Sequence, residues 1–287
     1  MPKDIIIKSS MTRISADQLK SNLGDVIRAT VLASSVSENF LWITDEKGKS
    51  LLKYFLEPNK IISLDKIAGG IVAEKVYNIN NYFFPGIEKI SGEWKIFVPD
   101  FSSQEIYTEK NTELLVPYSK IGFSSNKSYQ QALIESAGFL WKGQDYPLPK
   151  IDIPKKYDIG LNWNVHADWT SKHWPKEHWD KLEKILKKEF SVSYQQGLNN
   201  LDEYINWMAS CSTIITCESL GLHLASALRK RVIAIVGAAD NTEYSYNRIE
   251  FLKPAERACM PCNSPKCKFE SNCLSEIYPE DILKKLL

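Results

Sequence analysis

The strongest constraint on the fold of this chain is the alternation of short apolar runs with segments of helical character. Residues 5–7 and Phe40–Thr44 have the apolar composition of buried strands, and residues 21–36 predict a glycine turn that opens an amphipathic helix. Strands that alternate with helices are typical of βαβ units, so we predict an α/β fold with a mainly parallel sheet. Further predicted elements of this half are a turn at 45–48 and strands of the same sheet at Ile71–Ala73 and 96–99.

The same alternation restarts in the second half of the chain, after a proline-rich segment. Residues 146–154 contain Pro147, Pro149 and Pro154. This segment is predicted to be a stiff connector, because each proline removes a backbone donor and favours extended structure. We therefore expect two domains, residues 1–148 and 149–287. The elements expected in the second half are strands at Tyr157–Asn162, 191–195, 213–216 and 231–237, and helices at 176–188, 201–210, 219–228 and 279–287.

Charge and composition exclude several classes of protein. Lys and Arg total 36 and Asp and Glu total 35, so the net charge of +1 gives no broad electrostatic footprint for nucleic acid. Hydrophobic residues make up 44% of the chain, which is the balance of a globular protein with a core. No apolar run approaches the roughly 18 residues of a membrane span, and the apolar run before Lys8 is too short for a secretory signal. We expect a cytoplasmic protein with at most peripheral membrane association.

The first candidate for chemistry is the Gly24-Asp25 pair at the start of a predicted helix. Glycine allows a tight turn with exposed amides, and a carboxylate is electrostatically favoured at a helix N-terminus. The alternative is that Asp25 is an ordinary N-cap or first-turn acid.

The second candidate is the polar and aromatic loop at residues 162–175, which follows a predicted strand and precedes a helix. Thr170, Ser171 and Lys172 lie in this loop. Ligands of open α/β sheets bind at the carboxyl edge of the strands, and a lysine with hydroxyls beside a helix N-terminus suits an anion such as a diphosphate. The alternative is a surface loop whose tryptophans pack on the domain.

The third candidate is the segment 216–225, where a strand ends in Glu218 and a helix begins at Ser219 and Gly221. Free backbone amides at such a helix start can bind an anion. The alternative makes Glu218 and Ser219 capping residues, and His223 a half-buried structural histidine.

The fourth candidate is a group of four cysteines with the spacing C-x2-C-x4-C-x5-C, formed by Cys259, Cys262, Cys267 and Cys273. In a reducing compartment, thiols this close in sequence favour a metal over two disulfides. Tetrahedral thiolate sites take zinc or iron, and reduced thiols without a metal are the alternative. Cys211 and Cys217 flank an apolar strand and are expected to be small core residues.

Taken in order, these motifs resemble glycosyltransferase family 9, the heptosyltransferase family of bacterial lipopolysaccharide assembly. The matching segments are LGDVIRATVL, LWITDEKGKSLL, YDIGLNWNVHADWTSKHWPKEHWDKL, STIITCESLGLHLASALRKRVIAIVG and CMPCNSPKCKFESNCLSEIYPEDI. The resemblance implies a GT-B fold, in which two Rossmann-like domains face a central cleft. It places the acceptor on the N-terminal domain and the nucleotide sugar on the C-terminal domain.

The resemblance also implies roles for individual residues. Asp25 matches the family's catalytic aspartate, and Lys172 matches the lysine that contacts the phosphate and sugar of the sugar donor. Glu218 stands where the family has a donor-binding aspartate. The donor-binding set implied by the resemblance and by the loop is Thr170, Ser171, Lys172, Glu218, Ser219, Leu220, Gly221 and His223.

The chain departs from the family pattern at several points. Residues 9–22 intervene between the first strand and the Gly-Asp turn, Glu218 is one methylene longer than aspartate, and Ala238-Ala239 replace the usual Pro-Thr. The four-cysteine cluster resembles that of a protein-modifying branch of the family, the autotransporter heptosyltransferases, where it binds iron.

The sequence therefore predicts an inverting glycosyltransferase with Asp25 as the base and Lys172 as the group that stabilises the leaving diphosphate. ADP-heptose is the expected sugar donor, and the acceptor is a hydroxyl of a lipopolysaccharide core, another surface glycan or a protein. No catalytic cofactor is expected, and zinc or iron at the four cysteines would be structural. The alternatives are a sugar-nucleotide-binding protein without activity and an iron-thiolate redox protein.

Overall fold

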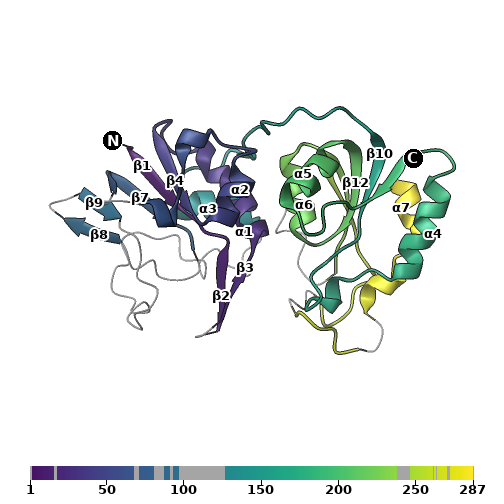
Figure 1. The fold of residues 1–287 in the computed structure, drawn as a ribbon. Coiled ribbons are helices and arrows are strands. Elements are labelled where there is room, and N and C mark those ends of the chain that lie inside the picture. Colours follow the sequence, from purple (N-terminus) through teal and green to yellow (C-terminus); the bar gives the residue numbers. More distant parts are fainter. Residues whose placement is uncertain are drawn as a thin grey trace. The chain divides into compact units, whose positions relative to one another are not determined.

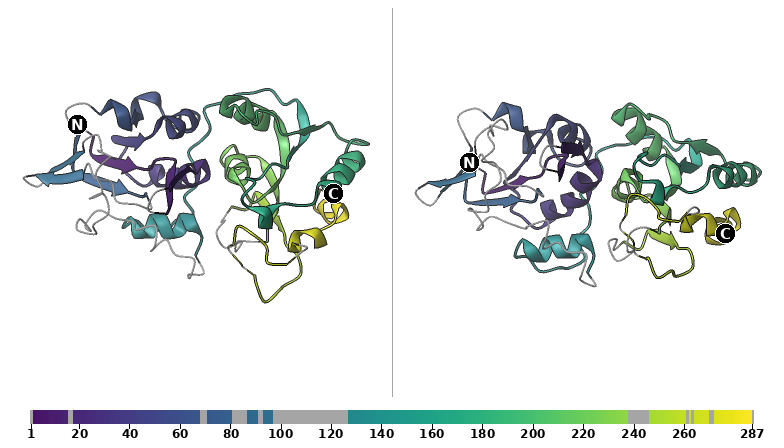
Figure 2. Two further views of the ribbon diagram at one scale, coloured as in Figure 1. Left: turned by 60° about the horizontal axis from the view of Figure 1, so that its bottom comes forward. Right: turned by 90° about the horizontal axis from the view of Figure 1, so that it is seen from below.

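The computed structural model describes residues 2–15, 18–67, 71–80, 87–90, 93–96, 127–237, 246–260, 262, 264–269 and 272–286. The chain forms two compact units, unit 1 (Met1–Lys150) and unit 2 (Ile151–Leu287), which are coloured from purple to teal and from teal to yellow in Figures 1 and 2.

The core of unit 1 is a parallel sheet of four strands in the order β5-β4-β1-β7. The central strand β1 (Asp4–Ile7) is buried along its whole length, which explains its run of isoleucines. It pairs with β4 (Phe40–Thr44) and β7 (Lys75–Asn78), and β5 (Ile61–Ser63) pairs with β4 at the edge. The prediction of a parallel sheet is confirmed.

The helices of unit 1 follow the strands as expected for βα units. The helices and helical turns are α1 (Leu23–Ala29), η1 (Thr30–Ser34), α2 (Glu46–Leu52), η2 (Pro58–Lys60), η3 (Leu64–Lys66) and α3 (Tyr129–Ser136). The predicted turn at 45–48 is wrong, because α2 begins at Glu46. Gly48 lies inside that helix, where an added Cβ would come within 2.0 Å of Thr44 Oγ1, so the glycine allows close packing there.

A second sheet of unit 1 is antiparallel and contains β6 (Ile71–Ala73), β9 (Glu93–Ile96) and β8 (Ile87–Ile90). The assignment of Ile71–Ala73 to the parallel sheet was therefore wrong. Only Glu74 separates β6 from β7, and a parallel neighbour of β7 would need a longer crossover connection. Of the predicted strand 96–99, Ile96 ends β9 and the remainder lies outside the described residues.

The segment between β1 and α1 contains a hairpin of β2 (Met11–Ser15) and β3 (Gln18–Ser21). The hairpin leaves and rejoins the unit at one place, because Asn22 N donates to Ser10 O at 2.5 Å. The helix α1 therefore starts beside the end of β1 in space, although residues 9–22 separate them in sequence.

Unit 2 contains a parallel sheet of five strands with helices on both faces (Figure 1). The helices α5 and α6 lie on one face, and α4 and α7 lie on the other. The predicted strands and helices of this half are confirmed, with ends shifted by one or a few residues. In sheet order the strands are β11 (Val192–Tyr194), β10 (Tyr157–Asn162), β12 (Cys211–Cys217), β13 (Arg231–Ile235) and β14 (Ile249–Leu252), and the helices and helical turns are η6 (Thr170–Lys172), α4 (Lys176–Leu186), α5 (Leu201–Ala209), α6 (Leu220–Ala227), η8 (Cys273–Glu276) and α7 (Pro279–Leu286).

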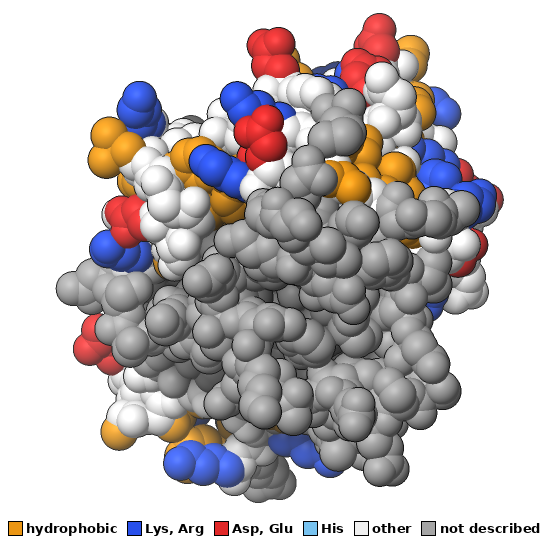
Figure 3. Space-filling view, turned by 90° about the vertical axis from the view of Figure 1, so that its left-hand side faces the viewer, with side chains coloured by type: hydrophobic (Ala, Val, Ile, Leu, Met, Phe, Trp, Pro, Cys, Tyr) orange, Lys and Arg blue, Asp and Glu red, His pale blue; other side chains and the backbone are white. Residues whose placement is uncertain are grey.

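The surface of the described residues mixes both signs of charge. In Figure 3 the visible Lys and Arg side chains lie among acidic and hydrophobic ones. Within the part of the chain that the structure describes, no helix combines the length and the apolar character needed to cross a membrane.

Candidate functional site

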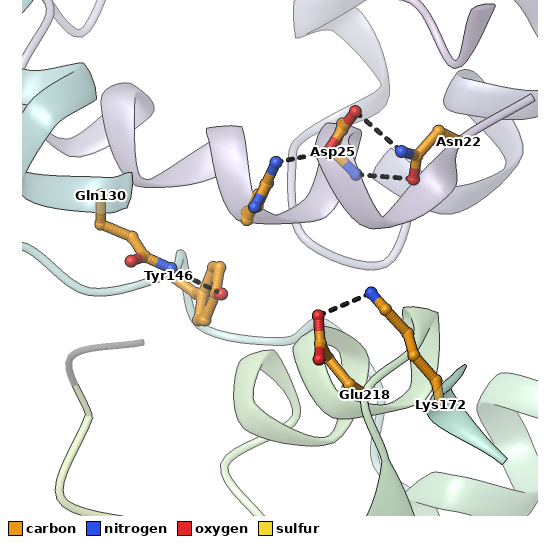
Figure 4. A network of polar contacts seen from close by, with 7 residues as sticks. Asn22, Asp25, Gln130, Tyr146, Lys172 and Glu218 are labelled. Carbon is orange, nitrogen blue, oxygen red and sulfur yellow. Dashed lines mark hydrogen bonds and ion pairs between the residues drawn. The ribbon is translucent and has the colours of Figure 1, made fainter. Parts of the chain in front are cut away.

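In unit 1, the Asp25 carboxylate is buried and held on both of its oxygens (Figure 4). Asn22, the N-cap of α1, donates from Nδ2 to Asp25 Oδ2 at 2.8 Å and accepts from the Asp25 amide at 3.2 Å. The Arg28 guanidinium forms an ion pair with Asp25 Oδ1 at 2.7 Å. The cap of this helix is thus Asn22, and Asp25 is a first-turn acid with two charged or polar partners.

A second cation, Lys8, lies close to this pair at the carboxyl end of β1. Its side chain is fully buried, and burial lowers its pKa, while the carboxylates of Asp25 and Asp45 oppose that shift and Arg28 reinforces it. Asp45 in turn accepts hydrogen bonds from Ser10, at 2.5 Å from the amide and 2.7 Å from the hydroxyl. Two buried cations, Lys8 and Arg28, thus lie near the carboxylates of Asp25 and Asp45 at the carboxyl end of β1.

The sequence analysis did not identify Asn22, Arg28 or Lys8. Arg28 lies three residues after Asp25, which is the spacing of neighbouring side chains on a helix, and this spacing could have indicated the ion pair. Lys8 directly follows the three isoleucines that end β1, and this carboxyl end is the position of ligand-binding residues in open α/β sheets.

In unit 2, Lys172 and Glu218 form the most buried ion pair of that unit among the described residues. Lys172 Nζ lies 2.6 Å from Glu218 Oε1, and their side chains are 18% and 5% exposed. The same ammonium lies 4.3 Å from the centre of the Trp169 ring, within the range of a cation–π contact. Two residues that the sequence placed in separate motifs are therefore in direct contact at the carboxyl end of β12 (Figure 4).

The helix that follows Glu218 is capped by Ser219, whose hydroxyl accepts from the Gly221 amide at 3.2 Å. Gly221 is required by packing, because an added Cβ would come within 2.2 Å of Asn162 Nδ2 and 2.6 Å of Tyr204 Oη. Ser219 and Leu220 are partly exposed at the start of α6, whereas His223 is buried one turn further on.

Asn162, the first residue of the predicted loop 162–175, is buried and connects these elements. It ends β10, donates to Thr216 Oγ1 at 2.8 Å and accepts from Tyr204 Oη at 2.8 Å. Burial raises the pKa of Tyr204, so the phenol stays protonated and donates this hydrogen bond. The network ties β10, β12 and α5 together beneath the start of α6.

The loop residues Thr170 and Ser171 form η6 beside the cysteine-containing segment. The Ser171 hydroxyl donates to Ser264 O at 2.5 Å and is buried, and Asn272 Nδ2 donates to Thr170 O at 3.1 Å. The Ser171 side chain thus holds this loop in place, and the Thr170 side chain is exposed. Ser171 directly precedes Lys172, so its hydrogen bonds help to fix the position of the Lys172 backbone.

The four late cysteines are free and partly exposed. Burial raises the pKa of the Cys273 thiol, the nearby Cys262 and Cys267 thiols raise it further, and Arg257 opposes the shift. Within the described ranges, no three His, Cys, Asp or Glu side chains are placed as the ligands of one metal ion.

The two earlier cysteines occupy the ends of β12. Cys211 and Cys217 are buried, and burial raises the pKa of each thiol to about 12. Their assignment as core residues is confirmed. Ala238 and Ala239 lie outside the described residues.

Comparisons with known proteins identify the fold. No protein-family model and no curated protein sequence matches the chain. Among solved structures, the chain is similar to a glycosyl transferase family 9 protein from Veillonella parvula, with 13% identity over 99% of this chain and 95% of that one and a TM-score of 0.66. It is also similar to E. coli ADP-heptose lipopolysaccharide heptosyltransferase II, with 15% identity, coverage of 99% and 97%, and a TM-score of 0.64.

A third similar structure is the iron-containing, dodecameric glycosyltransferase TibC from enterotoxigenic E. coli. The identity is 13%, the match covers 99% of this chain and 75% of that one, and the TM-score is 0.61. The chain thus has the GT-B fold, with two Rossmann-like units.

Proposed function

We propose that the protein is an inverting glycosyltransferase that transfers heptose from ADP-heptose to a hydroxyl of a glycan, glycolipid or protein acceptor. The observation that supports this most directly is the contact of Lys172 with Glu218 at the carboxyl end of β12. Ligands bind at this edge in open α/β sheets. The fold of the chain is also that of a heptosyltransferase that is named for ADP-heptose.

In this proposal, Asp25 of unit 1 is the general base. The acceptor hydroxyl attacks the anomeric carbon of heptose and its proton passes to the Asp25 carboxylate, while the bond from that carbon to the diphosphate breaks and ADP leaves. The inserted hairpin leaves the start of α1, with Asp25, beside the end of β1, because Asn22 N donates to Ser10 O at the base of the hairpin.

Unit 2 is proposed to bind the sugar donor. Negative charge grows on the leaving diphosphate, and Lys172 together with the amides at the start of α6 would stabilise it. Glu218, with one carboxylate oxygen on Lys172, is positioned to orient the ammonium and to accept from a sugar hydroxyl. Thr170, Ser171, Ser219, Leu220, Gly221 and His223 are the further donor-site residues of the proposal.

The four late cysteines are proposed to hold a structural zinc or iron ion that stabilises the end of unit 2. The spacing of Cys259, Cys262, Cys267 and Cys273 supports this. A set of thiolates suits either metal. The proposed transfer reaction has no step at this site. We further propose that unit 1 binds the acceptor and that the protein acts in the cytoplasm, with at most peripheral contact with a membrane.

A thermal-shift screen with ADP, GDP and UDP, followed by an assay of ADP release from ADP-heptose, tests the function. A nucleotide that binds only the folded chain raises the melting temperature, by an amount set by its concentration over Kd. We expect a shift with ADP alone and slow ADP release with water as the acceptor. A shift with ADP but no release on adding candidate acceptors would instead indicate a binding protein without activity.

A further inference from the structure

The Asp25 carboxylate is held in one orientation by residues of its own helix. Asn22 Nδ2 contacts Oδ2 at 2.8 Å and Arg28 Nη2 contacts Oδ1 at 2.7 Å, so each oxygen has one fixed partner (Figure 4). A carboxylate offers about four acceptor positions. Two of them are taken by these partners, and the proposal assigns another to the acceptor hydroxyl.

Arg28 is itself fixed by a second element. Its guanidinium lies 3.9 Å from the centre of the Tyr129 ring, and Tyr129 is the first residue of α3. The arginine side chain is 8% exposed, and that of Asp25 is 6% exposed. A guanidinium is planar, so it can lie face-on to a ring while its edge pairs with a carboxylate in a fixed direction.

The pair is unlike the other ion pairs of unit 1. The described pairs Lys127–Glu135 and Lys150–Glu57 join side chains that are all at least 33% exposed. A buried pair gains little stability over well-packed apolar residues, because both charges lose their hydration. A role in orienting the carboxylate accounts for its burial better than a gain in stability does.

We infer that Arg28, braced by Tyr129, is a positioning residue that orients Asp25 for proton transfer from the acceptor hydroxyl, with Asn22 holding the other oxygen. This inference rests on the proposed function, in which Asp25 is the base. It adds that three residues set the geometry of the base by acting through Asp25, namely Asn22, Arg28 and Tyr129.

The test measures ADP release from ADP-heptose, with water as the acceptor, for Arg28→Met, Arg28→Lys and Arg28→Ala. Misplacing a reacting group by about 1 Å costs about 100-fold in rate, so Arg28→Met should lower kcat about 100-fold and leave the Kd for ADP unchanged. Arg28→Lys should recover part of the rate, and guanidinium ion should restore activity to Arg28→Ala. Asn22→Ser keeps a helix-capping hydroxyl but loses the donor to Oδ2, so it should lower kcat in the same way.

Lys127→Met is the matched control, because it removes an exposed ion pair of the same unit and should leave kcat unchanged. Arg28 variants with wild-type kcat, alongside an inactive Asp25→Asn, would refute the positioning role and leave the proposed function intact. Full activity of Asp25→Asn, or no ADP release by the wild type, would refute the proposed function itself.

Crystal structures of wild type and Arg28→Met test the orientation without turnover. We expect the Asp25 carboxylate to leave its wild-type rotamer in the variant. An unchanged rotamer would overturn the inference whatever the assays show.

Discussion

At the residue scale, the candidate chemistry depends on a few charged side chains that are removed from water. Lys172 and Glu218 are 46 positions apart in sequence and 2.6 Å apart in space. Interactions between charges strengthen as the surrounding dielectric falls. A lysine in such a setting interacts more strongly with a diphosphate than an exposed lysine does.

We predict that Lys172→Ala lowers kcat for transfer or hydrolysis of ADP-heptose about 100- to 1,000-fold, the usual effect of removing one preorganised electrostatic group. Steady-state kinetics on the folded variant measure this. Lys176→Ala is the matched control, since Lys176 pairs with Asp180 at the surface with 81% of its side chain exposed, and it should behave as wild type. Similar kinetics for the two variants would argue against a role for Lys172.

At the scale of single elements, α6 ends in a conformation that its residue disfavours. Arg229 has a φ of 61°, in the left-handed region, where glycine is the usual residue after a helix. Its amide donates to Ser226 O at 3.1 Å, and the Lys230 amide donates to Ala225 O at 3.0 Å, which is the hydrogen-bond pattern of a Schellman motif.

We predict that Arg229→Gly stabilises the protein by about 1 kcal/mol, because a residue with a Cβ pays about 1–2 kcal/mol for this conformation. Chemical unfolding measures the change. Arg229→Ala is the control, since it removes the same side-chain contacts but keeps the Cβ. A free energy of unfolding for Arg229→Gly at or below that of Arg229→Ala would contradict the prediction.

At the scale of the whole molecule, the chain keeps a known fold with little sequence identity. The identity to the similar structures reported above is 13–15%, and each match extends over 99% of the chain. Buried positions need an apolar side chain of about the right size and not one particular residue. The pattern of strands and helices can therefore persist while most residues change.

A metal ion at the four late cysteines, near the end of unit 2, would change the stability of the whole molecule. We expect protein purified without added metal to contain about one zinc or iron ion per chain. A free metal concentration of about 1,000 times Kd stabilises the folded chain by about 4 kcal/mol. A chelator should therefore lower the melting temperature by about 10 °C. Elemental analysis and a thermal melt measure these. Cys262→Ser should lose the metal, and Cys211→Ala, in the buried strand β12, should keep it. Metal-free wild-type protein would refute the site.

The sequence by itself determined the class of the fold, and it supplied the candidate positions for chemistry. The apolar runs at β1, β4 and β12 predicted parallel strands, since a strand buried on both faces is apolar throughout. The prediction that Ile71–Ala73 joins the parallel sheet was wrong. A run of three apolar residues suits a parallel or an antiparallel sheet, and only the short connection to β7 decides which sheet β6 joins.

The tertiary structure alone decided which polar groups meet. Asn162 and Thr216 are 54 positions apart, and Arg28 and Tyr129 are 101 positions apart, so no local pattern could reveal these contacts. The physical reason is that periodicity records which face of an element is buried, whereas a polar contact depends on the packing of several elements. The sequence thus predicted Asp25, Lys172 and Glu218 as site residues, and the fold supplied the polar contacts that hold their side chains.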